Sequence, residues 1–266
     1  MDLFVKISEK NQISPEIVTV ARYVIMDAEE LVKISAADTR VGTIPLHKRC
    51  AALPTVVYDP DALEQLHNTL TILLYNGVKA FYIPNLYGFT AMLEAVKRTT
   101  TQEARDTPPI KPAIFKTLGI TLIAGSELNI ANHEAIEEYA NMGITETVLT
   151  PEITAHQTRR LARKYSVGIY AYGRLPLMTY RSCPLSVHGC PQKSKGTPSH
   201  PCMLTDRTGR AFPFQCENPG GVSKMRNSHP LWIADKISSF NGISFAILDF
   251  SIEDAAACTR ITRAFL

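Results

Sequence analysis

Short runs of β-branched and apolar residues alternate with segments of helical period from the start of the chain to about residue 180. This alternation is typical of β/α units built around a parallel sheet. A further apolar run follows near the end of the chain. The pattern predicts eight strands, at residues 3–8, 20–27, 41–46, 79–84, 120–125, 145–150, 167–173 and 243–249.

The segments between these runs predict helices of unequal quality. The strongest covers residues 60–76, where leucines recur at spacings of three and four residues. Asp59 followed by Pro60 is a start signal, and Gly77 is a stop signal. Further helices are predicted at residues 132–142, at 154–165 and from about Glu253 onward.

Eight strands with intervening helices in 266 residues match the size of a TIM-type (β/α)8 barrel. The first crossover is short and contains Pro15, so an incomplete barrel or an open doubly wound sheet is the alternative. The predicted organisation places barrel strands one to seven in residues 1–182. A cysteine- and proline-rich insertion follows at 183–236, and the last strand and helix of the barrel lie at 237–266.

The insertion after strand seven differs in composition from the rest of the chain. Residues 183–230 contain seven of the 17 prolines and four of the six cysteines. A connection that leaves the carboxyl end of a barrel strand lies on the face where barrel active sites are built. The same face is expected to hold the polar residues that follow the other strands, namely His47, Arg49, Asn85, Glu127, Asn129, Glu152, Tyr172 and Arg174.

The four clustered cysteines are spaced C-x6-C-x11-C-x13-C, at Cys183, Cys190, Cys202 and Cys216. In a reducing compartment clustered thiols are more often metal ligands or catalysts than disulfides. The close cysteine pairs of a zinc ribbon are absent. The spacing therefore favours an iron–sulfur cluster over zinc, with unligated thiols as a third possibility. Cys50 and Cys258 stand apart and are interpreted as packed thiols.

Charge becomes informative only within the insertion. The whole chain has a net charge of +3, whereas residues 183–230 carry six basic side chains against two acidic ones. This excess fits an anionic substrate, such as RNA or a carboxylate-bearing metabolite. The excess of basic side chains is explained equally well if they offset the negative charge of a thiolate-ligated cluster, or if they belong to a solvated loop.

The apolar runs are too short for a membrane helix, and the mean hydropathy is −0.03. The first residues also lack the pattern of a signal peptide, so a soluble cytoplasmic protein without a membrane partner is expected. The motifs H-E-x-x-H, G-x-S-x-G, G-x-G-x-x-G and the Walker loop are absent. Serine or zinc hydrolysis of a known type therefore has no support in the sequence.

Several motifs, taken in order, resemble the collagenase-like peptidase family U32. The resemblance is strong over about residues 120–250 and weak before them. Its motifs are S-E-L-N-I at 126–130, T-P-E-I at 150–153, Y-G-R-L-P-L-M at 172–178, Cys183-Pro184, Cys190, L-T-D-R-T-G at 204–209 with Phe212-Pro213, and N-S-H-P-L at 227–231.

The resemblance implies a barrel-like domain with a [4Fe–4S] cluster held by four cysteines. Relatives hydroxylate tRNA or ribosomal RNA, or take part in oxygen-independent quinone hydroxylation, and a collagenase-like minority carries the peptidase label. Cys183 and Cys190 match the first two ligands of the family, and Cys202 fits the third. The fourth ligand often stands where this chain has Gly221. Either Cys216 replaces it, or the site has three protein ligands.

Three functional hypotheses follow. The first is an iron–sulfur enzyme that modifies RNA or a small aromatic metabolite, with Glu127, Asn129, Glu152 and Arg174 positioning substrate or handling protons at the barrel mouth. The second is a metal-dependent peptidase that uses Glu152 with His188, His200 or His229. The third is a non-enzymatic, metal-stapled subunit of a complex, with zinc as the alternative metal. The chain resembles one half of longer family members, so the expectation is either a compact paralogue or a chain that works with a partner in a homo- or hetero-oligomer. Trp232 is predicted in the core, and Asn85 as the cap of a helix from Leu86.

Overall fold

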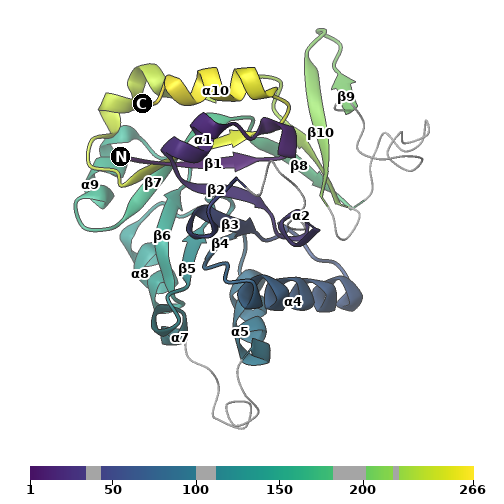
Figure 1. The fold of residues 1–266 in the computed structure, drawn as a ribbon. Helices are drawn as coiled ribbons and strands as arrows, with labels where there is room; N and C mark the ends of the chain where they lie inside the picture. Colours follow the sequence, from purple (N-terminus) through teal and green to yellow (C-terminus); the bar gives the residue numbers. More distant parts are fainter. Residues whose placement is uncertain (34–42, 100–111, 182–201, 218–221) are drawn as a thin grey trace.

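Eight parallel strands close into a barrel in the computed structural model, which describes residues 1–33, 43–99, 112–181, 202–217 and 222–266. Each strand pairs with the next along the chain, and the last pairs with the first, Phe4 lying opposite Ile247. The predicted TIM-type barrel is thus confirmed and is closed (Figure 1). Its strands are β1 Asp2–Ile7, β2 Ala21–Asp27, β3 Arg49–Ala52, β4 Ala80–Ile83, β5 Thr121–Ala124, β6 Ile144–Leu149, β7 Val167–Gly173 and β13 Phe245–Phe250.

Helices occupy the connections between strands, and several begin at a capping side chain. Ser14 caps the first helix with Pro15 at its first position, so the proline starts the short first crossover and does not interrupt it. The α-helices are α1 Pro15–Val20, α2 Ala28–Lys33, α4 Pro60–Tyr75, α5 Tyr87–Thr99, α7 Ala113–Thr117, α8 His133–Asn141, α9 Ala155–Ala162 and α10 Ala255–Arg263. Short 3-10 helices are η1 Lys10–Gln12, η2 Leu46–Lys48, η3 Ser126–Leu128 and η6 Ala234–Phe240.

The third strand lies later in the chain than predicted. The apolar run 41–46 suggested a strand, but β3 is Arg49–Ala52, a short stretch of Cys and Ala that lacks strong β-formers. His47 therefore precedes the strand within η2, and Arg49 begins it. Both residues lie at the amino end of the barrel, so their expected place at the mouth is wrong.

The barrel encloses one apolar cluster, and a second fills the space between strands and helices. Inside, the rings of Phe4 and Phe245 stack with centroids 4.1 Å apart. Cys50 is buried in the inner cluster and Cys258 in the outer one, which confirms both as packed thiols. The side-chain nitrogen of Asn85 donates to the carbonyl oxygen of Thr55, an arrangement that differs from the predicted helix cap.

A four-stranded antiparallel sheet, which we name the insertion sheet, follows β7, and since its first strand lies before residue 183 the predicted start of the insertion is too late. Its strands are β8 Pro176–Tyr180, β9 Cys202–Thr205, β10 Ala211–Glu217 and β11 Val222–Arg226, in the order β8-β11-β10-β9. Figure 1 shows this insertion sheet projecting from one end of the barrel.

The two-residue strand β12, Leu231–Trp232, then pairs antiparallel with β7. Trp232 is 44% exposed there and meets Tyr172 edge-on, so its predicted place in the core is wrong. Among the described residues no helix is long and apolar enough to cross a membrane.

Candidate functional site at the barrel mouth

A layer of charged and phenolic side chains lies above the apolar interior, at the carboxyl end of the strands. Alternation along β1 turns Lys6 to the same side as Phe4, and alternation along β13 does the same for Asp249 and Ile247. Two cations of the insertion sheet join them. The mouth network, as we name it, consists of Lys6, Tyr82, Glu127, Tyr170, Lys224, Arg226 and Asp249.

Glu127 forms one half of the mouth network. The Tyr82 hydroxyl donates a hydrogen bond to Glu127 Oε2 over 2.7 Å, and Lys6 Nζ lies 4.0 Å from Glu127 Oε1. Burial acts to raise the pKa of Glu127, but the positive charges of Lys6 and Lys224 outweigh it, and this pKa lies below its usual value. Glu127 is therefore an ionised carboxylate at neutral pH.

Asp249 forms the other half. Its Oδ2 accepts hydrogen bonds of 3.0 Å from both the Tyr170 hydroxyl and Arg226 Nη1. Burial again acts to raise the pKa of Asp249. The positive charges of Arg226 and Lys6 lower it by more, so the pKa of Asp249 also lies below its usual value. The second oxygen, Oδ1, is buried and has no hydrogen-bond partner within the described ranges.

The two phenols of the mouth network remain protonated. Burial, together with the neighbouring carboxylates, raises the pKa of Tyr82 and of Tyr170 well above the usual value for tyrosine. Lys6 Nζ also lies 5.1 Å from the centre of the Tyr82 ring. The mouth thus combines ionised acceptors, neutral hydroxyl donors and cations in a low-dielectric environment. Groups of these kinds can bind an anionic group or transfer a proton.

Strand β11 carries its cations into this layer. Lys224 and Arg226 alternate along β11 and are 3% and 5% exposed, and the Lys224 ammonium group donates to the Thr55 hydroxyl. On β10, Gln215 donates to Ser8 Oγ over 2.7 Å, just after β1. One face of the insertion sheet therefore rests on the carboxyl end of the barrel. The predicted local excess of positive charge does not form a single exposed patch, because these two cations are buried.

Cys202 belongs to the other face of the insertion sheet. It lies directly opposite Phe214 across the β9–β10 pair, and the Phe214 ring packs against Tyr180 with centroids 5.7 Å apart. Residues that alternate with Phe214, such as Gln215, face the barrel. Cys202 and the cations of β11 are thus separated by the thickness of one sheet.

Of the four predicted cluster ligands, Cys183 and Cys190 lie outside the described residues. Cys216 stands in β10 two positions beyond Phe214, which makes it the diagonal neighbour of Cys202 in the backbone register. Diagonal positions of an antiparallel pair are about 7–8 Å apart. In the ranges that the structure describes, no three His, Cys, Asp or Glu side chains come together as a metal site.

Arg174, predicted as a catalytic residue, lies at the base of the insertion. Its Nη1 donates to the carbonyl oxygen of Asn227 over 3.2 Å and also contacts that of Ser228. The backbone N–H of Asn227 donates to the Leu175 carbonyl over 2.9 Å. Arg174 thereby ties together the two points where the chain leaves the barrel and returns to it.

Asn129 and Glu152, the other two residues predicted to act at the barrel mouth, lie outside the mouth network. Asn129 is exposed and adopts a φ of 53°, a left-handed conformation that asparagine tolerates better than most residues. Glu152 is exposed in the turn after β6. Of the four residues predicted to act at the mouth, the structure brings only Glu127 into the network.

Sequence reasoning missed most of the network because it examined residues that follow strands rather than residues within them. Lys6 follows the apolar run Leu3–Val5 of β1, D-L-F-V-K-I, and Asp249 is the one charge in β13, F-A-I-L-D-F. An isolated charge near the carboxyl end of a buried strand is the signal that points to a barrel mouth.

Two glycines without side chains make room for the side chains of the mouth network. At Gly125 a Cβ atom would come within 2.6 Å of Glu127 Oε2 and within 2.7 Å of the Tyr82 ring. Gly173 has a φ of +137°, and a Cβ atom there would lie 2.4 Å from the Tyr170 hydroxyl. Larger residues would displace the groups that bind the two carboxylates.

Comparison with known proteins does not assign a function to the chain. No family model and no curated protein sequence matches the chain. Among solved structures, the chain is similar to the HpcH/HpaI aldolase from Desulfitobacterium hafniense DCB-2, at 14% identity and a TM-score of 0.32. The match covers 64% of this chain and 77% of that one. A likeness of this degree carries no information about activity.

Proposed function

We propose that the protein is an iron–sulfur-dependent modification enzyme of the hydroxylation type, which acts on RNA or on a small aromatic metabolite bound at the barrel mouth. One observation carries the proposal. The sheet that bears Cys202 and Cys216 is the same sheet that delivers Lys224 and Arg226 into the mouth network. Cofactor ligands and substrate-binding charges would thus be parts of one unit.

The backbone positions of two of the four cysteines are compatible with a cluster. Cys202 is partly buried on β9, and Cys216 is its diagonal neighbour on β10, so two of the four thiol-bearing positions are adjacent. A bound [4Fe–4S] cluster would supply one-electron redox chemistry, or an iron open to substrate if only three cysteines ligate it. The sequence resemblance to the U32 family supports the same assignment.

The side chains of the mouth network have separate roles in this proposal. Lys6 and Arg226 hold Glu127 and Asp249 ionised, and they offer positive charge to an anionic substrate. Glu127 takes the proton that the substrate releases, and the hydrogen bond from the Tyr82 hydroxyl to Oε2 orients its carboxylate. Tyr82 can donate its own proton in a hydrogen bond without losing it, because its pKa is raised. The stacked rings of Phe4 and Phe245 form the floor beneath them.

The cofactor part is tested on protein purified without oxygen. We expect a brown preparation with visible absorbance and with iron and labile sulfide in similar amounts. Cys202→Ser should lose most of the iron, whereas Cys258→Ala, which removes a packed thiol of α10, should keep it. A colourless, iron-free protein contradicts the proposal, and equal iron content in the two variants contradicts the role of Cys202.

The activity part uses host cells that lack the protein. Mass spectrometry of their RNA and of their aromatic metabolites should reveal one compound that has lost the mass of an oxygen atom. The unaltered gene should restore it, whereas Glu127→Gln should not, although that variant keeps its iron. If neither extract changes, the non-enzymatic subunit becomes the better hypothesis. Cleavage of gelatin by metal-loaded protein would instead support the peptidase, for which the structure describes only His229 of the three candidate histidines, in an exposed position.

A further inference from the structure

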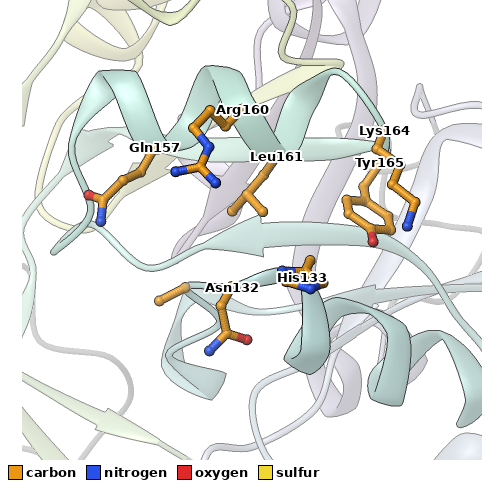
Figure 2. Close-up of a pocket in the computed structure, with 8 residues that line it drawn as sticks. Asn132, His133, Gln157, Arg160, Leu161, Lys164 and Tyr165 are labelled. Carbon is orange, nitrogen blue, oxygen red and sulfur yellow. The ribbon is translucent and has the colours of Figure 1, made fainter.

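A cavity of about 350 Å³ lies on the outside of the barrel, between α8 and α9. Figure 2 shows Gln157, Arg160 and Leu161 on the side of α9 that faces the start of α8, where Asn132 and His133 lie. We name this cavity the outer groove. Its volume falls within the range of small-molecule sites, roughly 300–1,000 Å³.

The α9 side of the outer groove is basic. Residues 155–164 contain four Arg or Lys residues and no carboxylate. Two of these cations have partners, because Lys164 donates to Glu137 over 2.8 Å and Arg159 donates to the Ser239 carbonyl over 3.0 Å. Arg160 lines the groove, and no described residue bonds or pairs with its guanidinium.

The α8 side of the outer groove offers further hydrogen-bond donors. Asn132 caps the nine-residue helix α8, its side-chain oxygen accepting the N–H of Ala135 over 2.9 Å, which leaves its amide nitrogen as a donor. The positive end of the α8 dipole adds to the charge of Arg160. Two carboxylates oppose it, since Glu134 lies 3.2 Å from His133 Nε2 and Glu137 accepts from Lys164 over 2.8 Å.

An apolar wall completes the outer groove. Leu161 and Tyr165 both line it, and the Tyr165 hydroxyl is held by Glu137 over 2.5 Å, which fixes the plane of the ring. The groove therefore pairs a cationic end with a flat, partly aromatic surface. That combination suits a ligand with an anionic group and a planar ring.

We propose that the outer groove binds a small phosphate-bearing ligand of nucleotide size. The phosphate lies against Arg160 and the start of α8, and the ring of the ligand lies against Leu161 and Tyr165. The side-chain nitrogen of Gln157 provides a donor for polar atoms of the ring, since its Oε1 already accepts the N–H and the hydroxyl of Thr154 over 2.8 Å. The site is separate from the mouth network and does not depend on a metal cluster.

Isothermal titration calorimetry with adenosine 5′-monophosphate, adenosine and inorganic phosphate tests the site. We expect saturable binding of the nucleotide, and weaker binding of either part alone. Arg160→Ala should weaken nucleotide binding about tenfold or more, because it removes a charge-assisted contact. Arg163→Ala is the matched control, since Arg163 carries the same charge on the same helix but does not line the groove. Both residues are exposed, so both variants should fold.

Three results would overturn the proposal. The first is the absence of saturable nucleotide binding. The second is equal weakening in the Arg160 and Arg163 variants, which would indicate a diffuse positive field rather than a site. The third is a single-stranded RNA oligonucleotide that binds tightly while the mononucleotide does not, which would make the basic face of α9 a polyanion surface.

Discussion

The barrel mouth and the outer groove differ in the burial and the pairing of their arginine side chains. In the mouth, Arg226 is 5% exposed and donates to a carboxylate, an amide oxygen and a backbone carbonyl. In the groove, Arg160 is exposed and has no partner among the described residues. A buried charge destabilises the folded protein unless it is paired, whereas an exposed charge remains solvated and can bind a ligand without such a partner. The mouth charges are therefore expected to determine stability as well as chemistry, and the groove charge only binding.

One connection serves both regions. The segment between β5 and α8 contributes Glu127 to the mouth network and, five positions later, Asn132 to the outer groove. Ile130 between them is fully buried, and its carbonyl accepts the N–H of Thr150 over 3.0 Å. Because Ile130 anchors the segment, we expect a substitution in one region to leave the other in place, so the two regions can be compared by mutation.

The largest effect is expected at Arg226. Arg226→Met leaves Asp249 buried without its main cation, and breaking a buried pair from one side costs about 3–5 kcal/mol of unfolding free energy. Urea denaturation followed by circular dichroism measures the loss. The double variant Arg226→Met, Asp249→Asn should recover part of it, because the uncompensated charge is gone. A loss below about 1 kcal/mol in the single variant would show that the mouth is more hydrated than its burial suggests.

The packing of the mouth network is tested at Gly173. Gly173→Ala combines a left-handed φ, worth about 1–3 kcal/mol, with a Cβ that collides with the Tyr170 hydroxyl. Gly209→Ala is the matched control, because Gly209 has a φ of +81° with nothing within 4 Å of the added carbon. Denaturation midpoints should fall further for Gly173→Ala than for Gly209→Ala. Equal shifts would mean that backbone strain alone, and not the crowded mouth, explains the cost.

The acid sensitivity of the mouth network gives a smaller effect. The pKa values of Glu127 and Asp249 are lower in the folded protein than in the unfolded chain, where they are about 4.3 and 3.9. Their contribution to stability is complete above the unfolded values and is lost as the pH falls through the folded ones. Denaturation between pH 7 and pH 3 should therefore show stability falling below about pH 4. Asp249→Asn should flatten that dependence, and an unchanged slope would contradict the assignment.

How far the sequence predicts this molecule differs between the barrel and its mouth. Seven strands fall close to their predicted positions because alternation and buried runs are local signals, as at residues 120–125 against Thr121–Ala124. The third strand was misplaced because Arg49–Ala52 is too short and too poor in β-branched residues to give such a signal. A local signal also located the helix start at Asp59, which caps α4.

The mouth network depends instead on which strands meet across the barrel. Lys224 and Arg226 look like a solvated basic loop until pairing in the insertion sheet turns them toward Thr55 and Asp249. Asn129 looks like a functional residue because it follows a strand, yet its left-handed φ accounts for an asparagine at that position. Tertiary pairing of this kind leaves no periodic trace in the sequence.

The smallest effect is expected in the outer groove, and it completes the comparison. Arg160→Ala should change the unfolding free energy by no more than about 0.5 kcal/mol, because the side chain is exposed and makes no contact that folding could lose. Lys164→Ala removes an exposed pair with Glu137 and should destabilise slightly more than Arg160→Ala, which removes no pair. Measured beside Arg226→Met in the same urea series, the three variants should fall in the order Arg226, Lys164, Arg160. If Arg160→Ala destabilises as much as Lys164→Ala, then its guanidinium already serves the fold, and the division between a structural mouth and an uncommitted groove fails.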